Sequence, residues 1–336
     1  MDRTEDDMKF IGFFGIFNKS FKTIFSWKKI FTQITLAFIL PLAIVFLSHM
    51  AISNRVFWRI QNNSLPYDTN DSREATTAEW LYYLLFTIAY FILLTVFSIL
   101  ATAAGVFTVA SVYTGRDVDF RSVLKIIPKV WKRLFVTFVF IYIALIIYDA
   151  IVSIVMAIFR AVLGFSSFSL IVMIIILIVF AFCLLYLSVV CQLASVVTVL
   201  ENIHGRKALK KGKDLANGKK IDGMGIAFVL YAILVGLIIV YFLFVEYGHE
   251  VFKWALIWRV LIGILCGIVL LMLFLVMIVS QTMLYLVCKS YHREAIDKLS
   301  LSTFLGAYMG ETVVYPKPGE EIQLGRPQPS APDQQV

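Results

Sequence analysis

Residues 161–200 read AVLGFSSFSLIVMIIILIVFAFCLLYLSVVCQLASVVTVL and contain no charged side chain. An ionised side chain at the centre of a bilayer costs at least about 2.5 kcal/mol, so a long uncharged run indicates a transmembrane helix. As one helix, this run would extend about 60 Å, twice the thickness of the hydrocarbon core. Gly164 and the serines at 166, 167 and 169 favour a turn at its start. We therefore expect a span that begins near Ser169 and extends beyond the bilayer at its far end.

Five further stretches have the same character. Charged residues make up only 15% of the chain and hydrophobic residues 60%, against roughly a quarter and a half in soluble domains. The other candidate spans are the uncharged runs 30–54, 80–115, 223–245 and 260–288, and the segment 134–159, which only Asp149 interrupts. The second and sixth of the six spans are also long enough to continue past the bilayer. The predicted fold class is all-α: a polytopic membrane protein with six transmembrane helices in a membrane domain over residues 30–290.

The distribution of basic residues predicts the orientation. Of the 30 lysines and arginines, 24 lie in the two termini and in loops 114–133 and 201–222, and six lie in the alternate loops. Such a bias in short loops places both termini in the cytosol. It also explains most of the net charge of +8, so the basicity does not indicate nucleic-acid binding. We expect an integral protein of the plasma membrane or the endomembrane system, with no cleaved signal peptide.

The two terminal segments differ from the spans. Residues 1–29 predict a cytosolic amphipathic helix, because apolar side chains recur there at helical spacing: Phe10, Phe13, Phe14, Phe17, Phe21, Ile24 and Phe25. This face could lie in the membrane interface or pack on protruding ends of the spans, and the two can coexist. Residues 291–336 form a predicted cytosolic tail, which is rich in proline and expected to be disordered from about residue 315.

A weak internal repeat links the starts of the odd-numbered spans. Trp27-Lys28-Lys29-Ile30-Phe31 resembles Trp131-Lys132-Arg133-Leu134-Phe135, and Gly218-Lys219-Lys220-Ile221 is a poorer third copy. Each copy follows a short amphipathic segment and opens a span. Interfacial Trp and Lys are general membrane anchors, so convergence is an alternative explanation. We favour a three-fold repeat of helix pairs.

The sequence contains no recognisable catalytic chemistry. The motifs HExxH, GxSxG, GxGxxG and CxxC and the P-loop are absent, and the four histidines are scattered. The four cysteines all fall within spans, so they predict no disulfide framework. We therefore expect a protein that is not an enzyme and that holds no cofactor or metal.

Loop 201–222 is the richest polar stretch and carries a family resemblance. After Glu201 at the end of a span it has Gly205, Ala208-Leu209, Lys210-Lys211, Leu215 and Gly218-Lys219-Lys220 before the next span. This pattern is similar to the membrane domain attached to some bacterial glycerophosphoryl diester phosphodiesterases, with Gly212 where that pattern usually has serine. FKTIFSWKKIFTQITLAFILPLAIVFLSH, residues 21–49, and the whole layout resemble a family of uncharacterised plant multi-pass proteins. The resemblance implies an accessory membrane domain and supplies no catalytic residue.

Two functions remain open from the sequence. The first is a non-enzymatic membrane-organising or lipid-interacting protein, whose basic loop would contact anionic headgroups on the cytosolic side through Arg206, Lys207, Lys210, Lys211 and Lys213. The same residues could instead only fix the topology. The second is a small-solute transporter that uses Asp149. An ionised carboxylate facing lipid is costly, so we expect Asp149 to face the helix bundle, in a structural role or in a proton or solute pathway.

Two further patterns concern partners and modification. Gly263 and Gly267 form a GxxxG motif, and Ala101 with Gly105 is a second pair of small residues. Such pairs let helices approach closely, either within the chain, as we expect, or in a homo-oligomer. Asn62 and Asn70 lie in glycosylation sequons between the first two spans, which the charge bias places outside the cytosol.

Overall fold

The computed structural model describes residues 12–63, 71–116, 118–164, 166–248, 255–292 and 306. Every element in the described part of the chain is helical. Six helices there are long and apolar enough to span a membrane, at Lys28–Phe57, Ala78–Tyr113, Phe120–Leu163, Ser167–Leu200, Lys220–Glu246 and Leu256–Tyr291. The predicted fold class and all six predicted spans are confirmed.

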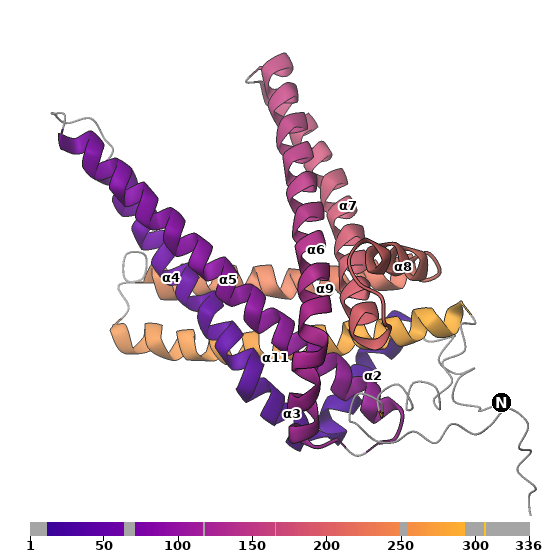
Figure 1. The fold of residues 1–336 in the computed structure, drawn as a ribbon. Helices are drawn as coiled ribbons and strands as arrows, with labels where there is room; N and C mark the ends of the chain where they lie inside the picture. Colours follow the sequence, from indigo (N-terminus) through magenta and orange to yellow (C-terminus); the bar gives the residue numbers. More distant parts are fainter. Residues whose placement is uncertain are drawn as a thin grey trace, which may run out of the picture.

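The spans form three helical hairpins that diverge from a common base (Figure 1). In the first hairpin, α3 (Lys28–Ile34), η1 (Thr35–Ile39) and α4 (Leu40–Asn63) run outward and α5 (Asp71–Tyr113) returns. The second hairpin consists of α6 (Phe120–Leu163) and α7 (Ser167–Leu200). The third consists of α9 (Lys220–Val240), η2 (Tyr241–Glu246) and α11 (Leu256–Tyr291). The helix pairing that the repeat hypothesis requires is therefore present.

Two short helices complete the base. The helix α2 (Phe13–Ser26) packs on α11 and α9, and α8 (Arg206–Ala216) packs on α7 and α6. The starts of the hairpins are not equivalent, since the chain breaks between α2 and α3 at Trp27 but α6 continues unbroken through Trp131. Internal symmetry therefore stays a prediction.

The turn between α6 and α7 lies where glycine and serine predicted it. Gly164 ends α6 with a positive φ of 62°, which glycine adopts without the steric cost of a Cβ atom. The Ser166 hydroxyl then accepts a hydrogen bond from the backbone N–H of Ser169, 3.1 Å away, and caps α7. The fourth span begins at Ser167, two residues before the predicted start.

Helix α6 is longer than the sequence indicates. Its 44 residues extend about 66 Å, because the helix begins at Phe120 rather than after the charged segment 114–133. Four basic side chains of this segment are exposed, those of Arg121, Lys125, Lys129 and Lys132, while Val123, Ile126 and Val130 are buried in the base. The segment is thus an amphipathic extension of the third span, and only residues 114–119 connect it to α5.

The buried core lies in the base, where the returning helices meet. It includes residues 101–111 of α5, 189–200 of α7 and 283–288 of α11. Gly105 of α5 packs directly on the side chain of Ile278 of α11, and Ala101 is buried one turn away. The Ala101 and Gly105 pair therefore brings two helices of the same chain together, as expected. The outer halves of α6 and α7 are largely exposed.

Candidate functional site

Helix α8 is fixed to α7 by a close backbone contact. It buries Ala208, Gly212, Leu215 and Ala216. A Cβ atom at Gly212 would lie 2.8 Å from the carbonyl oxygen of Val190 and 3.0 Å from the nitrogen of Ala194. Real Cβ atoms do not approach backbone this closely, so only glycine permits the observed distance between the two helices.

The opposite face of α8 is basic and exposed. Arg206, Lys207, Lys210 and Lys213 are exposed on it, together with Asp214, which leaves a formal charge of +3 among these five side chains. Lys211 is half-buried at the edge of this face. The structure places these residues on a short helix, which packs on the extended end of the fourth span. Contact of its lysines with anionic lipid stays a prediction.

Polar contacts hold the end of α7 in place beneath α8. The Thr137 hydroxyl of α6 lies 2.9 Å from that of Thr198 of α7, and its oxygen accepts a hydrogen bond from the Gly205 N–H at 3.0 Å. Gly205 has a φ of 63° and directly precedes α8. All three residues are buried. These bonds satisfy buried groups that would otherwise be costly and fix where α8 begins.

Glu201, directly after α7, joins that helix to α11. Its Oε1 atom accepts hydrogen bonds from Lys289 Nζ at 2.8 Å and from the Tyr285 hydroxyl at 2.7 Å. Burial alone would raise the pKa of Glu201, but the bonds from Lys289 and Tyr285 and the charges of Lys289 and Lys211 lower it below its ordinary value. The ionised carboxylate therefore stabilises the base.

One part of the surface of α2 packs on other helices, and another part is exposed. Ile16 and Ser20 are buried, and the Ser20 hydroxyl accepts a hydrogen bond from Ser280 of α11 at 3.4 Å. Phe14, Phe21 and Phe25 lie on the adjoining flank and are exposed. The predicted amphipathic helix is present at Phe13–Ser26 and packs on the ends of spans. The first part of the prediction, including Phe10, lies outside the described residues. Its contact with the membrane interface stays a prediction.

A central cavity of about 1000 Å³ lies where the hairpins diverge, and all six spans line it. Most of its lining is apolar, but several polar side chains also line it. Among them, the Tyr231 hydroxyl accepts hydrogen bonds from Ser188 at 3.0 Å and from Gln192 at 3.2 Å. The sequence did not reveal this cavity. Its polar residues are spread singly or in pairs over the spans, so no local pattern could have marked them.

Asp149 does not face the bundle, so that expectation is wrong for the single chain. Its side chain is exposed on the outer half of α6, and it does not line the central cavity. The helix beside it in the hairpin is α7, and on the other sides no described segment covers this part of α6.

The remaining sequence candidates lie apart from the base. A Cβ atom added at Gly263 or at Gly267 would lie at an ordinary van der Waals distance from Val245 or Leu47 of the same chain. Asn62 lies in the last turn of α4, and Asn70 lies outside the described residues, as does the tail beyond residue 306. Among the described residues, no group of histidine, cysteine and acidic side chains could hold a metal ion.

The fold and the exposed apolar spans define a multi-pass membrane protein. The chain belongs to the family described as Domain of unknown function (DUF8558), whose model matches residues 1–326. No curated protein and no solved structure matches the chain.

Proposed function

We propose that the protein is a non-enzymatic, lipid-interacting component of its membrane, which uses the base to bind an anionic leaflet. The observation that carries the proposal is the exposed basic face of α8, with Arg206, Lys207, Lys210 and Lys213 held on a helix that cannot move away from α7 without losing buried contacts. A lysine or arginine near an anionic surface contributes about 1 kcal/mol.

The position of α2 supports the same orientation of the base. Its exposed phenylalanines at positions 14, 21 and 25 belong to the end of the molecule that carries α8. Aromatic side chains and cations together favour a membrane interface, where rings lie among the acyl chains and cations among the headgroups. The proposal places both helices on the cytosolic leaflet, which follows from the predicted topology.

The central cavity is a second place where the proposed protein could bind lipid. Its volume and its apolar lining suit an acyl chain, and the hydroxyl and amide groups around Tyr231 suit a glycerol or ester oxygen. The likeness to the membrane domain of bacterial glycerophosphoryl diester phosphodiesterases and to plant multi-pass proteins stays a hypothesis within this proposal. Asp149 lies outside the cavity, so no observation favours the alternative of a small-solute transporter.

The test compares two matched double variants of the full chain, reconstituted in vesicles of phosphatidylcholine and phosphatidylserine. Lys210→Gln with Lys213→Gln removes two charges from α8, and Lys125→Gln with Lys132→Gln removes two exposed charges from α6. After detergent extraction, mass spectrometry measures the phosphatidylserine that remains with each protein. We expect the α8 variant to retain at least about fivefold less, and more salt to reduce the wild-type amount. An equal loss from both variants would show that α8 has no special role.

A further inference from the structure

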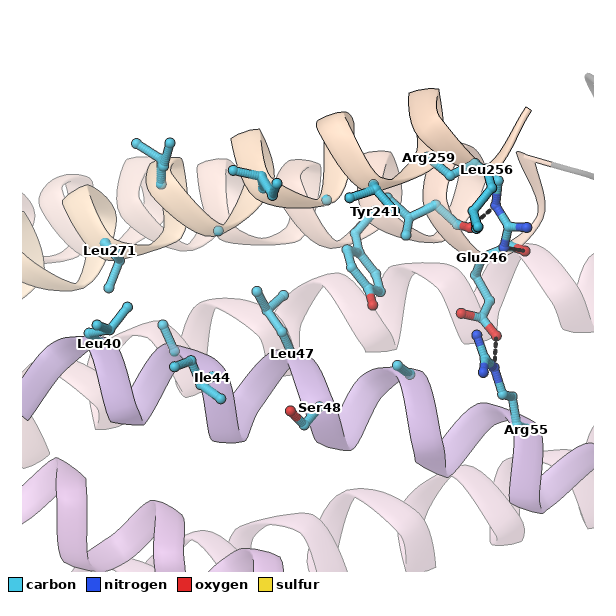
Figure 2. Close-up of a pocket in the computed structure, with 18 residues that line it drawn as sticks. Leu40, Ile44, Leu47, Ser48, Arg55, Tyr241, Glu246, Leu256, Arg259 and Leu271 are labelled. Carbon is cyan, nitrogen blue, oxygen red and sulfur yellow. Dashed lines mark hydrogen bonds and ion pairs between the residues drawn. The ribbon is translucent and has the colours of Figure 1, made fainter. Parts of the chain in front are cut away.

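A second hollow lies beyond the base, between the first and third hairpins. It has a volume of about 640 Å³ and is lined by α4, η2 and α11 (Figure 2). Its walls are formed by Leu40, Ile44 and Leu47 on α4 and by Leu271 on α11. Gly263 and Gly267 of α11 also line it, and their missing side chains leave the space open. The result is a groove that is apolar along most of its length.

The groove ends in three charged side chains at the end of the hairpins away from α8. Arg55 of α4 donates from Nε to Glu246 Oε1, 3.4 Å away. Arg259 of α11 donates from Nε to the carbonyl oxygen of Val245 at 2.7 Å and from Nη2 to that of Glu246 at 3.3 Å. Figure 2 shows both arginines beside Glu246 at one end of the hollow. Among the described residues, these two cations and one anion leave a formal charge of +1 at this end.

The arginines retain the capacity to bind an anion. A guanidinium has five N–H donors, and the bonds above use one donor of Arg55 and two of Arg259. The Arg55 side chain is 70% exposed, whereas that of Glu246 is 10% exposed. The Glu246 side chain is therefore held in place by its surroundings, whereas the exposed Arg55 side chain can extend toward a ligand. A phosphate oxygen would complete this arrangement because arginine binds phosphate with paired, charge-assisted hydrogen bonds.

The length of the groove fits one lipid leaflet. The helix distance from Leu40 to Arg55 is about 22 Å, and one leaflet contributes about 15 Å of hydrocarbon, so the groove spans the acyl region and reaches the headgroup level. An acyl chain would fill the apolar part, and the phosphate would lie beside Arg55. A helix of a second copy would bury the excess positive charge without an anion to balance it, so a lipid is the better occupant.

We propose that this groove binds one phospholipid of the leaflet opposite α8, with an acyl chain between α4 and α11 and the phosphate at Arg55 and Arg259. The groove is separate from α8, so a test of lipid binding in the groove is independent of the function proposed for the base. In this proposal, Gly263 and Gly267 leave space for the groove rather than join two chains.

The experiment uses native mass spectrometry of the full chain, purified in detergent and stripped of lipid. The probes are phosphatidylcholine and a diacylglycerol with the same acyl chains, which lacks the phosphate. We expect the wild type to bind phosphatidylcholine about tenfold more tightly than diacylglycerol. Arg55→Gln should remove this difference, and Arg55→Lys should restore part of it. Arg55 is chosen because its exposed side chain can be replaced with little effect on folding.

A second variant tests the acyl part of the groove. Gly267→Leu fills the space between α11 and α4, and we expect it to weaken the binding of both lipids about tenfold. Ala157→Leu is the matched control, since Ala157 is exposed on α6 and lines neither this groove nor the central cavity. Equal binding of the two lipids by the wild type would overturn the proposal. So would unchanged lipid binding by Gly267→Leu, full competition by inorganic phosphate, or a dimer that excludes the lipid.

Discussion

Gly212→Ala should loosen α8 from α7, although alanine is the better helix former. Two backbone atoms, the Val190 oxygen at 2.8 Å and the Ala194 nitrogen at 3.0 Å, face the added methyl group, and neither can rotate away. Overpacking of this kind costs about 1 to 3 kcal/mol, while alanine gains about 1 kcal/mol over glycine in a helix. Because backbone blocks the methyl group, we take the upper part of the range and expect a net cost of about 1 to 2 kcal/mol.

Hydrogen exchange measures this cost locally. In the full chain in detergent, the amides of α8 should exchange about 5 to 30 times faster in Gly212→Ala than in the wild type. Gly236→Ala is the matched control, because a Cβ atom there meets nothing within 4 Å and α8 should keep its protection. If Gly212→Ala left the exchange of α8 unchanged, the close contact between the two helices would be refuted, together with the rigid basic face that depends on it.

Three further predictions concern the base and the topology. Because the pKa of Glu201 is lowered in the fold, its carboxylate stabilises the protein at pH values above the ordinary pKa, and this contribution is lost as the pH falls through the lowered pKa. Glu201→Gln should therefore lower the melting temperature by about 2 to 4 °C at pH 7. The melting temperature of this variant should also fall less steeply than that of the wild type below pH 5. Thr137→Val keeps the shape but leaves the Gly205 N–H without its acceptor, so thermal unfolding should show a loss of about 1 to 3 kcal/mol. In a host that glycosylates secreted proteins, any glycan should disappear from gels when Asn62→Gln and Asn70→Gln are combined, and a glycan that survives both changes would contradict the predicted orientation.

The spans and α8 could be predicted because their signals are local. An uncharged run such as 161–200 must be buried in lipid or protein whatever surrounds it, so composition alone is decisive. In α8 the buried Ala208, Gly212 and Leu215 recur at helical spacing between lysines. The predicted start of the third span was placed too late, because the lysines of the charged segment before it suggested a loop. These lysines instead cover the exposed face of a helix that begins at Phe120.

The hollows could not be predicted because their residues come from distant parts of the chain. Arg55 and Glu246 meet across 191 positions, and neither lies in a motif. The prediction that Asp149 faces the helix bundle was wrong for a different reason. The rule that an intramembrane charge faces other helices assumes that the span is surrounded, whereas only α7 accompanies the outer half of α6. Asp149 is therefore exposed on the outer half of α6 rather than buried between helices.

The arrangement of the hairpins follows from the different driving forces at the two ends of the molecule. In the base, residues such as Phe31, Phe107 and Leu193 are buried and the helix ends pack closely. Where water would otherwise contact such side chains, burying them contributes hydrophobic free energy. In the bilayer that contribution disappears, because lipid tails are as apolar as the side chains, and helices there associate only through packing and hydrogen bonds. The outer halves of the hairpins make few such contacts, the Thr95 and Tyr142 hydroxyls at 3.0 Å being one. The cavity and the groove lie between hairpins that the base holds together, which is where the proposals place lipid.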